Sequence, residues 1–396
     1  MKNINKYGWK VKKLGEICEF FTDGNWIESK DQSEEGIRLL QTGNIGVGKF
    51  EDKEAKSRYI SECTFEKLNC TEVFPSDCLI SRLPEPVGRA CLVPDLGVKM
   101  ITAVDCTIAR FKEEIQPEFF IHYTQSGTYR NNVLAYLTGT TRKRISRGNL
   151  FNIPIPIPPL STQSAIVAEL DSLHRLKGLQ EQQLEEYDKL AQSTFYSMFG
   201  DPIENDKGWE VKKLGEICDV RDGTHDSPKY QLEGFPLITS KNIVSGKISF
   251  DNVNLISKED FDAINKRSKV DFGDILMPMI GTIGNPVIND TNKEFAIKNV
   301  ALIKCTNSKE KLNLYIKYTL DSPSFKEEYS KLILGGTQKF LSLGIIRNLE
   351  IPISPFSLQF QFAQRIEKIE TQKELVKQSI AQTEQLINYT MDKYFG

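Results

Sequence analysis

The sequence predicts an α+β protein with two homologous α/β domains at opposite ends of a long antiparallel two-helix coiled coil, related by pseudo-twofold symmetry. Three observations lead to this prediction. The chain of 396 residues contains one internal repeat of roughly 200 residues, each copy ends in a long heptad pattern, and a proline-rich stretch precedes each pattern. A unit this large that occurs only twice favours two domains, because a solenoid needs more copies of a much shorter unit.

The repeat begins near the start of the chain and continues to its end. Residues 8–18 read GWKVKKLGEIC and residues 208–218 read GWEVKKLGEIC, and these differ at a single position. Near the end of each copy, IPIPIPPLSTQ at 153–163 matches LEIPISPFSLQ at 349–359. The offset falls from 200 to 196 between these matches, so the two copies differ by only a few small changes in length.

The first part of each copy has the pattern of a mixed α/β domain. Short apolar runs such as IRLLQTGNIG (37–46) and DILMPMIGTIG (274–284) alternate with Gly, Asn, Asp and Pro, which predicts strands and turns. Helices are expected near 117–126 and 312–333. We therefore expect a first α/β domain at 1–155, a first long helix at 156–200, a second α/β domain at 201–350 and a second long helix at 351–396.

The proline-rich stretches and the residues that follow them predict the two long helices. Prolines at 154, 156, 158 and 159, and again at 352 and 355, exclude a helix interior and predict an extended chain. Ser161 and Ser357 are then candidate N-caps. Beyond them, seam residues recur at spacings of four and three over about five heptads, which is typical of a coiled coil. The expected seam residues are Ile166, Leu170, Leu173, Leu184 and Tyr187 in the first helix, and Phe362, Ile366, Ile369, Val376, Ile380 and Ile387 in the second.

Two lysines, Lys177 and Lys373, interrupt the two seams at the same point of the pattern. A polar seam residue lowers stability but can fix the register and orientation of a helix pair. Each helix follows its own domain, so antiparallel pairing would put one domain at each end of the pair. The alternative is a helix that packs only on its own domain, but a helix of about 38 residues, or about 57 Å at ~1.5 Å per residue, is longer than a small domain needs.

The composition fits a globular protein and excludes several other classes. Charged residues make up 26% and hydrophobic residues 39% of the chain, with a formal net charge of -2, which rules out wholesale disorder. We expect no membrane-spanning helix, because no apolar run reaches about 18 residues, and no signal peptide, because the first residues are too polar. Eight cysteines without a C-x-x-C pair and three histidines argue against a zinc site or a disulfide framework, so the expected location is the cytoplasm.

Motifs for catalysis by this chain itself are missing from the sequence. It contains no G-x-x-x-x-G-K-[ST] phosphate loop, no glycine fingerprint in a Rossmann context, and no Asn/Asp-Pro-Pro-Tyr/Phe tetrapeptide of an adenine methyltransferase. His225 in DGTHDSP (222–228) has no Cys or Ser partner nearby to suggest a nucleophile. The matching segment TDGNW (22–26) lacks the histidine, so a structural or contact role is favoured over catalysis.

The clearest basic cluster is TRKRISR at 141–147. Its Arg and Lys side chains are suited to neutralising phosphates, and Arg can also bind a guanine edge. Lys339 is the equivalent of Lys143 in the second copy. A solvated basic loop without a ligand is the alternative, and the residues alone do not decide between the two.

Taken in order, these motifs resemble the specificity (DNA-recognition) subunit of Type I restriction-modification systems, and the resemblance covers essentially the whole chain. No single motif is decisive, but their order and their duplication are very specific. The resemblance is carried by W-x-V-K-K-L-G-E-I-C at the start of each half, DGTHDSP (222–228), DILMPMIGTIG (274–284), GTQKFLSLGIIRNLEIPISP (336–355) and STFYSMFGDP (193–202).

The resemblance implies a non-catalytic subunit that reads a split, asymmetric sequence in double-stranded DNA. Each half would be a target-recognition domain for one half-site, and the paired helices would set the spacer. Two copies of a methyltransferase subunit and a motor-nuclease subunit would join it, so that the partners carry out adenine methylation and restriction. S-adenosylmethionine would bind the methyltransferase, with no cofactor on this chain and no membrane contact.

Other functions stay open from the residues alone. One is a coiled-coil scaffold or interaction protein whose domains bind protein or glycan, and another is an enzyme acting alone, which the missing motifs count against. We expect no catalytic and no metal-binding residues. The candidate DNA contacts are Arg142, Lys143, Arg144 and Arg147 in the first domain, and Thr224, His225, Lys241, Gln338 and Lys339 in the second.

Overall fold

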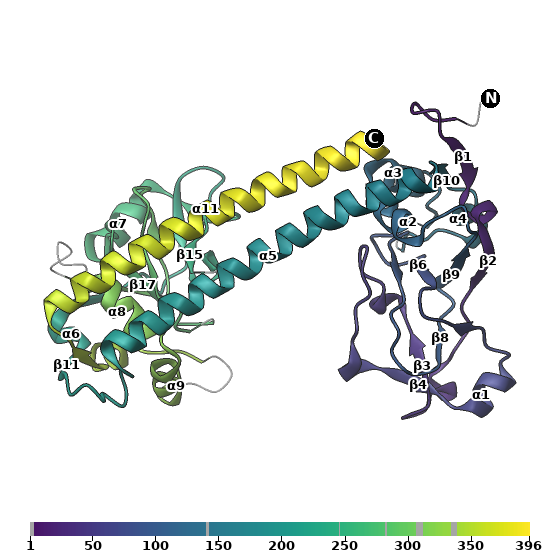
Figure 1. The fold of residues 1–396 in the computed structure, drawn as a ribbon. Coiled ribbons are helices and arrows are strands. Elements are labelled where there is room, and N and C mark those ends of the chain that lie inside the picture. Colours follow the sequence, from purple (N-terminus) through teal and green to yellow (C-terminus); the bar gives the residue numbers. More distant parts are fainter. Residues whose placement is uncertain (1–3, 140–141, 245, 282, 306–311, 334–338) are drawn as a thin grey trace. The chain divides into compact units, whose positions relative to one another are not determined.

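The chain folds into two structural units, each built from one α/β domain and a part of each of two long helices (Figure 1). The computed structural model describes residues 4–139, 142–244, 246–281, 283–305, 312–333 and 339–396. The first unit contains Met1–Glu181 and Gln378–Gly396, and the second contains Gln182–Lys377.

The domain of the first unit contains two four-stranded sheets and a two-stranded ribbon. The ribbon pairs β1 (Lys10–Lys13) with the proline-rich β10 (Pro154–Ile157). The first sheet has the order β2 (Cys18–Asp23), β9 (Cys106–Phe111), β6 (Cys78–Ser81), β7 (Ala90–Leu92). The second has the order β4 (Arg58–Ile60), β3 (Ile37–Leu40), β8 (Met100–Thr102), β5 (Glu72–Val73). Its short helices are η1 (Leu14–Ile17), η2 (Ser29–Asp31), η3 (Thr42–Asn44), η4 (Glu54–Lys56), α1 (Glu62–Lys67), α2 (Pro117–Thr124), α3 (Gly127–Ala135) and α4 (Arg147–Phe151).

The domain of the second unit repeats this plan. Its ribbon pairs β11 (Glu210–Lys213) with β21 (Glu350–Ile353). The first sheet has the order β12 (Cys218–Asp222), β20 (Val300–Cys305), β17 (Ile275–Pro278), β18 (Val287–Ile288). The second has the order β16 (Asn254–Ile256), β13 (Phe235–Ile238), β19 (Ala296–Ile297), and β14 (Ile243–Val244) pairs with β15 (Lys247–Ile248). Its short helices are α6 (Leu214–Ile217), η5 (Ser240–Asn242), α7 (Lys258–Ser268), α8 (Leu312–Asp321), α9 (Pro323–Lys331) and α10 (Leu343–Arg347).

The repeated prolines stand in ribbons of only two strands. Pro156 lies opposite Val11, and Pro352 lies opposite Val211. Proline lacks a backbone N–H, so it is tolerated where a strand has a free edge and not in the middle of a sheet. The extended conformation predicted for these stretches is therefore confirmed, and its duplication follows from the duplicated sequence.

Two helices of 40 residues each, α5 (Leu160–Phe199) and α11 (Phe356–Phe395), pack against each other in antiparallel orientation within both units. In the first unit Lys177 Nζ lies 2.7 Å from Glu384 Oε1, and Gln180 Nε2 donates to Ser379 Oγ at 2.8 Å. Partner numbers on α11 therefore fall as those on α5 rise, which confirms the predicted antiparallel pairing. Within the described residues, no helix is both long enough and apolar enough to cross a membrane.

The heptad positions are the less exposed positions of both helices. The two interrupting lysines are each paired across to the other helix, because Lys177 meets Glu384 and Lys373 Nζ lies 2.7 Å from Asp188 Oδ1. A charge at these seam positions thus has a partner in the antiparallel register. Of the expected seam residues, Ile166, Leu170, Phe362, Ile366, Ile369 and Val376 are buried, and Leu173, Leu184, Tyr187, Ile380 and Ile387 are half-buried.

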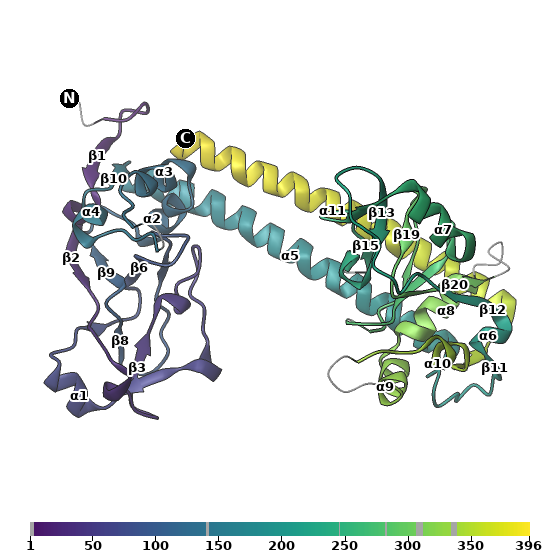
Figure 2. The same cartoon turned by 180° about the vertical axis from the view of Figure 1, so that it is seen from behind.

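The helices also share the hydrophobic cores of the domains. In the first unit, the Phe395 ring packs edge-on against Phe119 and Tyr123, with both pairs of ring centroids 5.5 Å apart. In the second unit, α8 lies beside the long helices (Figure 2). Tyr318 of α8 stacks on Phe195 of α5 and meets Phe362 of α11 edge-on. Each domain is therefore anchored on the helix pair by buried aromatic contacts.

The predicted N-caps of the long helices are wrong by two residues, because Pro159 and Pro355 hold the cap positions. The helices begin at Leu160 and Phe356, so Ser161 and Ser357 lie inside the first turn. Buried glutamines join each helix start to the preceding chain instead. Gln163 Nε2 donates to the Pro158 carbonyl at 2.9 Å, and the equivalent Gln359 donates to Ser354 at 2.8 Å.

Candidate nucleic-acid interface

In the first domain, an Asp-Gly turn follows β2 and is held tightly by the backbone of the strands beside it. Gly24 N donates to the Cys106 carbonyl, and Asn25 N donates to the Thr102 carbonyl, both at 2.9 Å. A Cβ atom at Gly24 would lie 2.2 Å from the Thr102 carbonyl oxygen. Only glycine fits such a close approach of two backbones, so this turn has one geometry.

The second domain holds the equivalent turn after β12 in the same way. Gly223 N donates to the Val300 carbonyl at 3.1 Å, and Thr224 N donates to the Ile297 carbonyl at 3.0 Å. A Cβ atom at Gly223 would lie 2.1 Å from the Ile297 oxygen. The two domains therefore carry the same backbone frame at this place, with different side chains on it.

The basic loop of the first domain lies beside its Asp-Gly turn. Arg147 Nη1 donates to Thr22 Oγ1 at 3.3 Å, and Arg144 Nη2 lies 3.3 Å from Asp105 Oδ1. Lys143 Nζ lies 3.5 Å from Glu85 Oε1. All four candidate cations of this loop, Arg142 included, are exposed. The structure thus brings the predicted residues of the first domain together on one surface.

Arg82 fixes the base of this loop. The Arg82 side chain is buried, and its guanidinium lies 3.2 Å from Asp23 Oδ2 and donates to the Val104 carbonyl at 2.6 Å. The Ile145 N–H donates to the backbone carbonyl of Arg82 at 3.2 Å. The sequence did not point to Arg82, because the contacts of Arg82 are with residues far away in the chain. The equivalent position holds Met279, whose carbonyl accepts from Leu341 N at 2.9 Å.

In the second domain, both ring nitrogens of His225 face oxygen atoms. Nδ1 lies 2.8 Å from Asn299 Oδ1, and Nε2 lies 2.8 Å from Asp222 Oδ2. The Asn299 contact and then the Asp222 contact raise the pKa of His225 above its usual value, against partial burial and the nearby charge of Arg267. The imidazolium form therefore persists to higher pH than in an unfolded chain. The side chain of His225 is 60% exposed, so the ring is open to a ligand.

The other candidate residues of the second domain differ in how they are placed relative to this turn. Thr224 Oγ1 accepts from Asp226 N at 3.1 Å. Lys339 is exposed and precedes Leu341, whose backbone is tied through Met279 to Asn299. Lys241 is exposed in η5. Gln338 lies outside the described residues.

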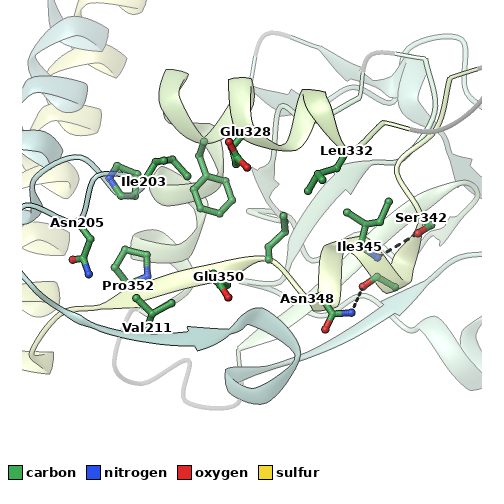
Figure 3. Close-up of a pocket in the computed structure, with 14 residues that line it drawn as sticks. Ile203, Asn205, Val211, Glu328, Leu332, Ser342, Ile345, Asn348, Glu350 and Pro352 are labelled. Carbon is green, nitrogen blue, oxygen red and sulfur yellow. Dashed lines mark hydrogen bonds between the residues drawn. The ribbon is translucent and has the colours of Figure 1, made fainter.

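A groove of about 680 Å³ in the second unit offers a contrasting surface. Figure 3 shows Ile203, Val211 and Leu332 around it, with Glu328 and Glu350 as carboxylates. The Ser342 hydroxyl accepts from Ile345 N at 3.3 Å at the start of α10, so it is engaged in helix capping. Among the described residues, no group of three His, Cys, Asp or Glu side chains could hold a metal ion. The groove is thus lined by apolar side chains together with polar and carboxylate groups.

The family model for the Type I restriction modification DNA specificity domain matches residues 6–187 and, a second time, residues 206–385. The chain belongs to this family. It is a specificity subunit of a Type I restriction-modification system, and the enzymatic activities of the system reside in partner subunits. The resemblance seen in the motifs is therefore confirmed, as is the fold of two recognition domains with paired long helices.

Individual relatives agree with this assignment. The chain is 25% identical to the Type I restriction enzyme MjaVIII specificity subunit of Methanocaldococcus jannaschii, over 73% of this chain and 72% of that protein. It is 21% identical to the EcoKI specificity subunit of Escherichia coli K12, over 91% and 82%. The crystal structure of the S subunit from M. genitalium has the same fold, with a TM-score of 0.52, 15% identity, and coverage of 100% and 97%.

A second solved structure has a closer fold. It comes from a structural study of complex assembly and conformational transition of the type I R-M system. The TM-score is 0.65 at 20% identity, and the match covers 98% of this chain and 97% of that one.

Proposed function

We propose that this specificity subunit reads a split, asymmetric target in double-stranded DNA, with one half-site for each α/β domain. The observation that supports this most directly is a shared loop frame with different side chains. Ile145 in the first domain and Leu341 in the second are tied to equivalent strands, yet Arg144 precedes one and Phe340 precedes the other. Two domains with the same backbone arrangement but different exposed side chains would read different bases.

The contacts to DNA would be of two kinds, contacts to phosphates and contacts to bases. Exposed cations in the first domain would bind phosphates and fix the position of the domain, and an Arg that reaches the major groove would bind a guanine edge. In the second domain, the His225 imidazolium and two lysines would supply the positive charge. The proposed contacts are Arg142, Lys143, Arg144 and Arg147, then Thr224, His225, Lys241, Gln338 and Lys339.

The partners would carry out the chemistry that follows recognition. We place two copies of an adenine methyltransferase subunit and a motor-nuclease subunit on this chain, in the cytoplasm, with S-adenosylmethionine bound to the methyltransferase. Because this chain would select the site only, methylation and restriction would both follow the sequence that it reads.

The long helices would set the distance between the half-sites. We take residues 1–155 and 201–350 as the target-recognition domains, with the spacer helices in 156–200 and 351–396. This assignment is supported by the aromatic anchors at the helix ends, such as Phe395 against Tyr123, because a domain packed into the helix pair transmits a fixed position.

Methylome sequencing of the host tests this function. With the gene present, we expect methylated adenines in an asymmetric motif of two half-sites separated by unspecified bases. Deleting the gene should remove methylation at that motif, and a plasmid copy should restore it. A methylome unchanged by deletion would contradict the proposed function and would favour a scaffold that binds protein or glycan.

A further inference from the structure

Trp26 stands at the end of the first Asp-Gly turn with its side chain turned to solvent. The residue is 70% exposed. The other two tryptophans of the chain, Trp9 and Trp209, are half-buried, and the Trp209 ring donates to the Phe199 carbonyl at 2.9 Å. Single apolar side chains on a surface are common, so exposure alone assigns no role to Trp26.

The residues before Trp26 hold its backbone in place, and this makes its exposed side chain significant. Asp23 accepts from Thr107 Oγ1 at 2.8 Å, and Asn25 Oδ1 accepts from Thr71 N at 2.8 Å. Gly24 is locked by its close approach to the Thr102 carbonyl. The side chains before Trp26 are thus engaged inside the domain, whereas the indole N–H of Trp26 makes only a long contact of 3.3 Å with the exposed Glu28. The domain holds this backbone rigidly and presents the ring outward.

The surroundings of Trp26 favour a polyanion over an apolar protein surface. Thr22, on the strand that leads into the turn, contacts Arg147, and Asp23 contacts Arg82. Asp105 precedes Cys106, whose carbonyl holds Gly24, and contacts Arg144. The turn that ends at Trp26 and the basic loop are therefore neighbours on one surface of the domain. DNA offers phosphates to such cations, and base faces and thymine methyl groups to such a ring.

The second domain places a different side chain on the same backbone frame. His225 occupies the position of Trp26, two residues after a glycine held by equivalent hydrogen bonds. The same backbone position thus carries an indole ring in one domain and an imidazole ring in the other. This is the pattern expected of a position that distinguishes two half-sites.

We propose that Trp26 is a specificity-determining residue that makes an apolar contact with a base of the first half-site. This inference rests on the proposed function and adds a residue to it. The contact would use the face of the indole ring against a thymine methyl group or an exposed base face, while the neighbouring cations bind the backbone. Loss of the ring would remove discrimination at that base and leave the second half-site unaffected.

The test compares Trp26→Ala with Trp26→Phe, which keeps an aromatic ring, and with Val98→Ala, which removes another exposed apolar side chain of the same domain. Each full-length variant is expressed with its partner methyltransferase, and methylated sites are sequenced. We expect Trp26→Ala to lower discrimination by about tenfold at one or more bases of the first half-site only. Trp26→Phe should retain most discrimination, and Val98→Ala should match the wild type.

Several outcomes would overturn this inference. One is that Trp26→Ala methylates the wild-type motif with wild-type selectivity. Another is that it no longer co-purifies with the methyltransferase, which would make Trp26 a protein contact. If methylation is lost while the complex stays intact, the affinity of the variant for cognate and for random-sequence duplexes is measured. Weaker binding to cognate DNA alone supports the inference, and equally weakened binding to both duplexes contradicts it. A wild type without any split motif would instead contradict the proposed function.

Discussion

Replacing Phe362 by alanine is expected to destabilise the second unit by about 3–5 kcal/mol. Phe362 is fully buried at the start of α11. Its ring centroid lies 5.1 Å from that of Tyr318 on α8, 5.2 Å from Phe199 and 5.7 Å from Phe195, both on α5. Alanine would leave a cavity where the domain and both long helices meet, because these neighbours are held by other contacts and cannot all collapse into the space.

Phe360 provides a matched control for this substitution. It lies two residues earlier on the same helix and is 41% exposed, so Phe360→Ala removes the same side chain without opening a core cavity. We expect the free energy of unfolding to change by no more than about 0.5 kcal/mol in the control. Urea unfolding of the full-length chain measures both variants. A loss below about 1 kcal/mol for Phe362→Ala would show that this cluster does not anchor the second domain.

Deleting one heptad from each long helix is expected to shorten the spacer of the DNA target by roughly three base pairs. The segments Leu173–Leu179 of α5 and Gln382–Asn388 of α11 face each other in the first unit, as the Lys177–Glu384 pair shows. Their joint removal keeps the heptad register and shortens the pair by about 10 Å at ~1.5 Å per residue. One base pair spans about 3.4 Å along the duplex, so about three are lost.

The motif methylated in cells measures this change in spacer. Deletion of Leu173–Leu179 alone serves as the control, because it shifts one seam against the other and should abolish methylation rather than shorten the spacer. An active double deletion that methylates a motif with the original spacer would exclude the helices as the element that sets the distance.

The repeat and the heptads predicted the fold well because both signals are local in the sequence. The spacing of residues such as Phe362 and Ile366 fixes one face of a helix whatever surrounds it. The first residues of the two long helices were harder to predict from the sequence. Gln163, and not the expected serine, ties the start of α5 to residues near 114–116, and no local pattern shows which distant backbone groups a glutamine side chain will meet.

The candidate interface was predictable in part for the same reason. The cluster Arg142–Arg147 is visible as a run of charges, but its mounting on Arg82 and Asp105 depends on strands that are distant in sequence. Trp26 could have been noticed from the alignment of TDGNW (22–26) with RDGTH (221–225), where it stands opposite His225. What the sequence did not show is that the glycine before it is locked against Thr102, which is why the ring projects from a rigid turn.

The claim that each α/β domain reads its own half-site is tested most directly by exchanging one domain. Residues 1–155 would be replaced by the corresponding segment of a relative with a different target, and the methylated motif would be sequenced in cells that carry the partner methyltransferase. We predict that one half of the motif changes to that of the relative, while the other half and the spacer length stay the same. A motif in which both halves change, or in which neither does while methylation persists, would contradict the claim.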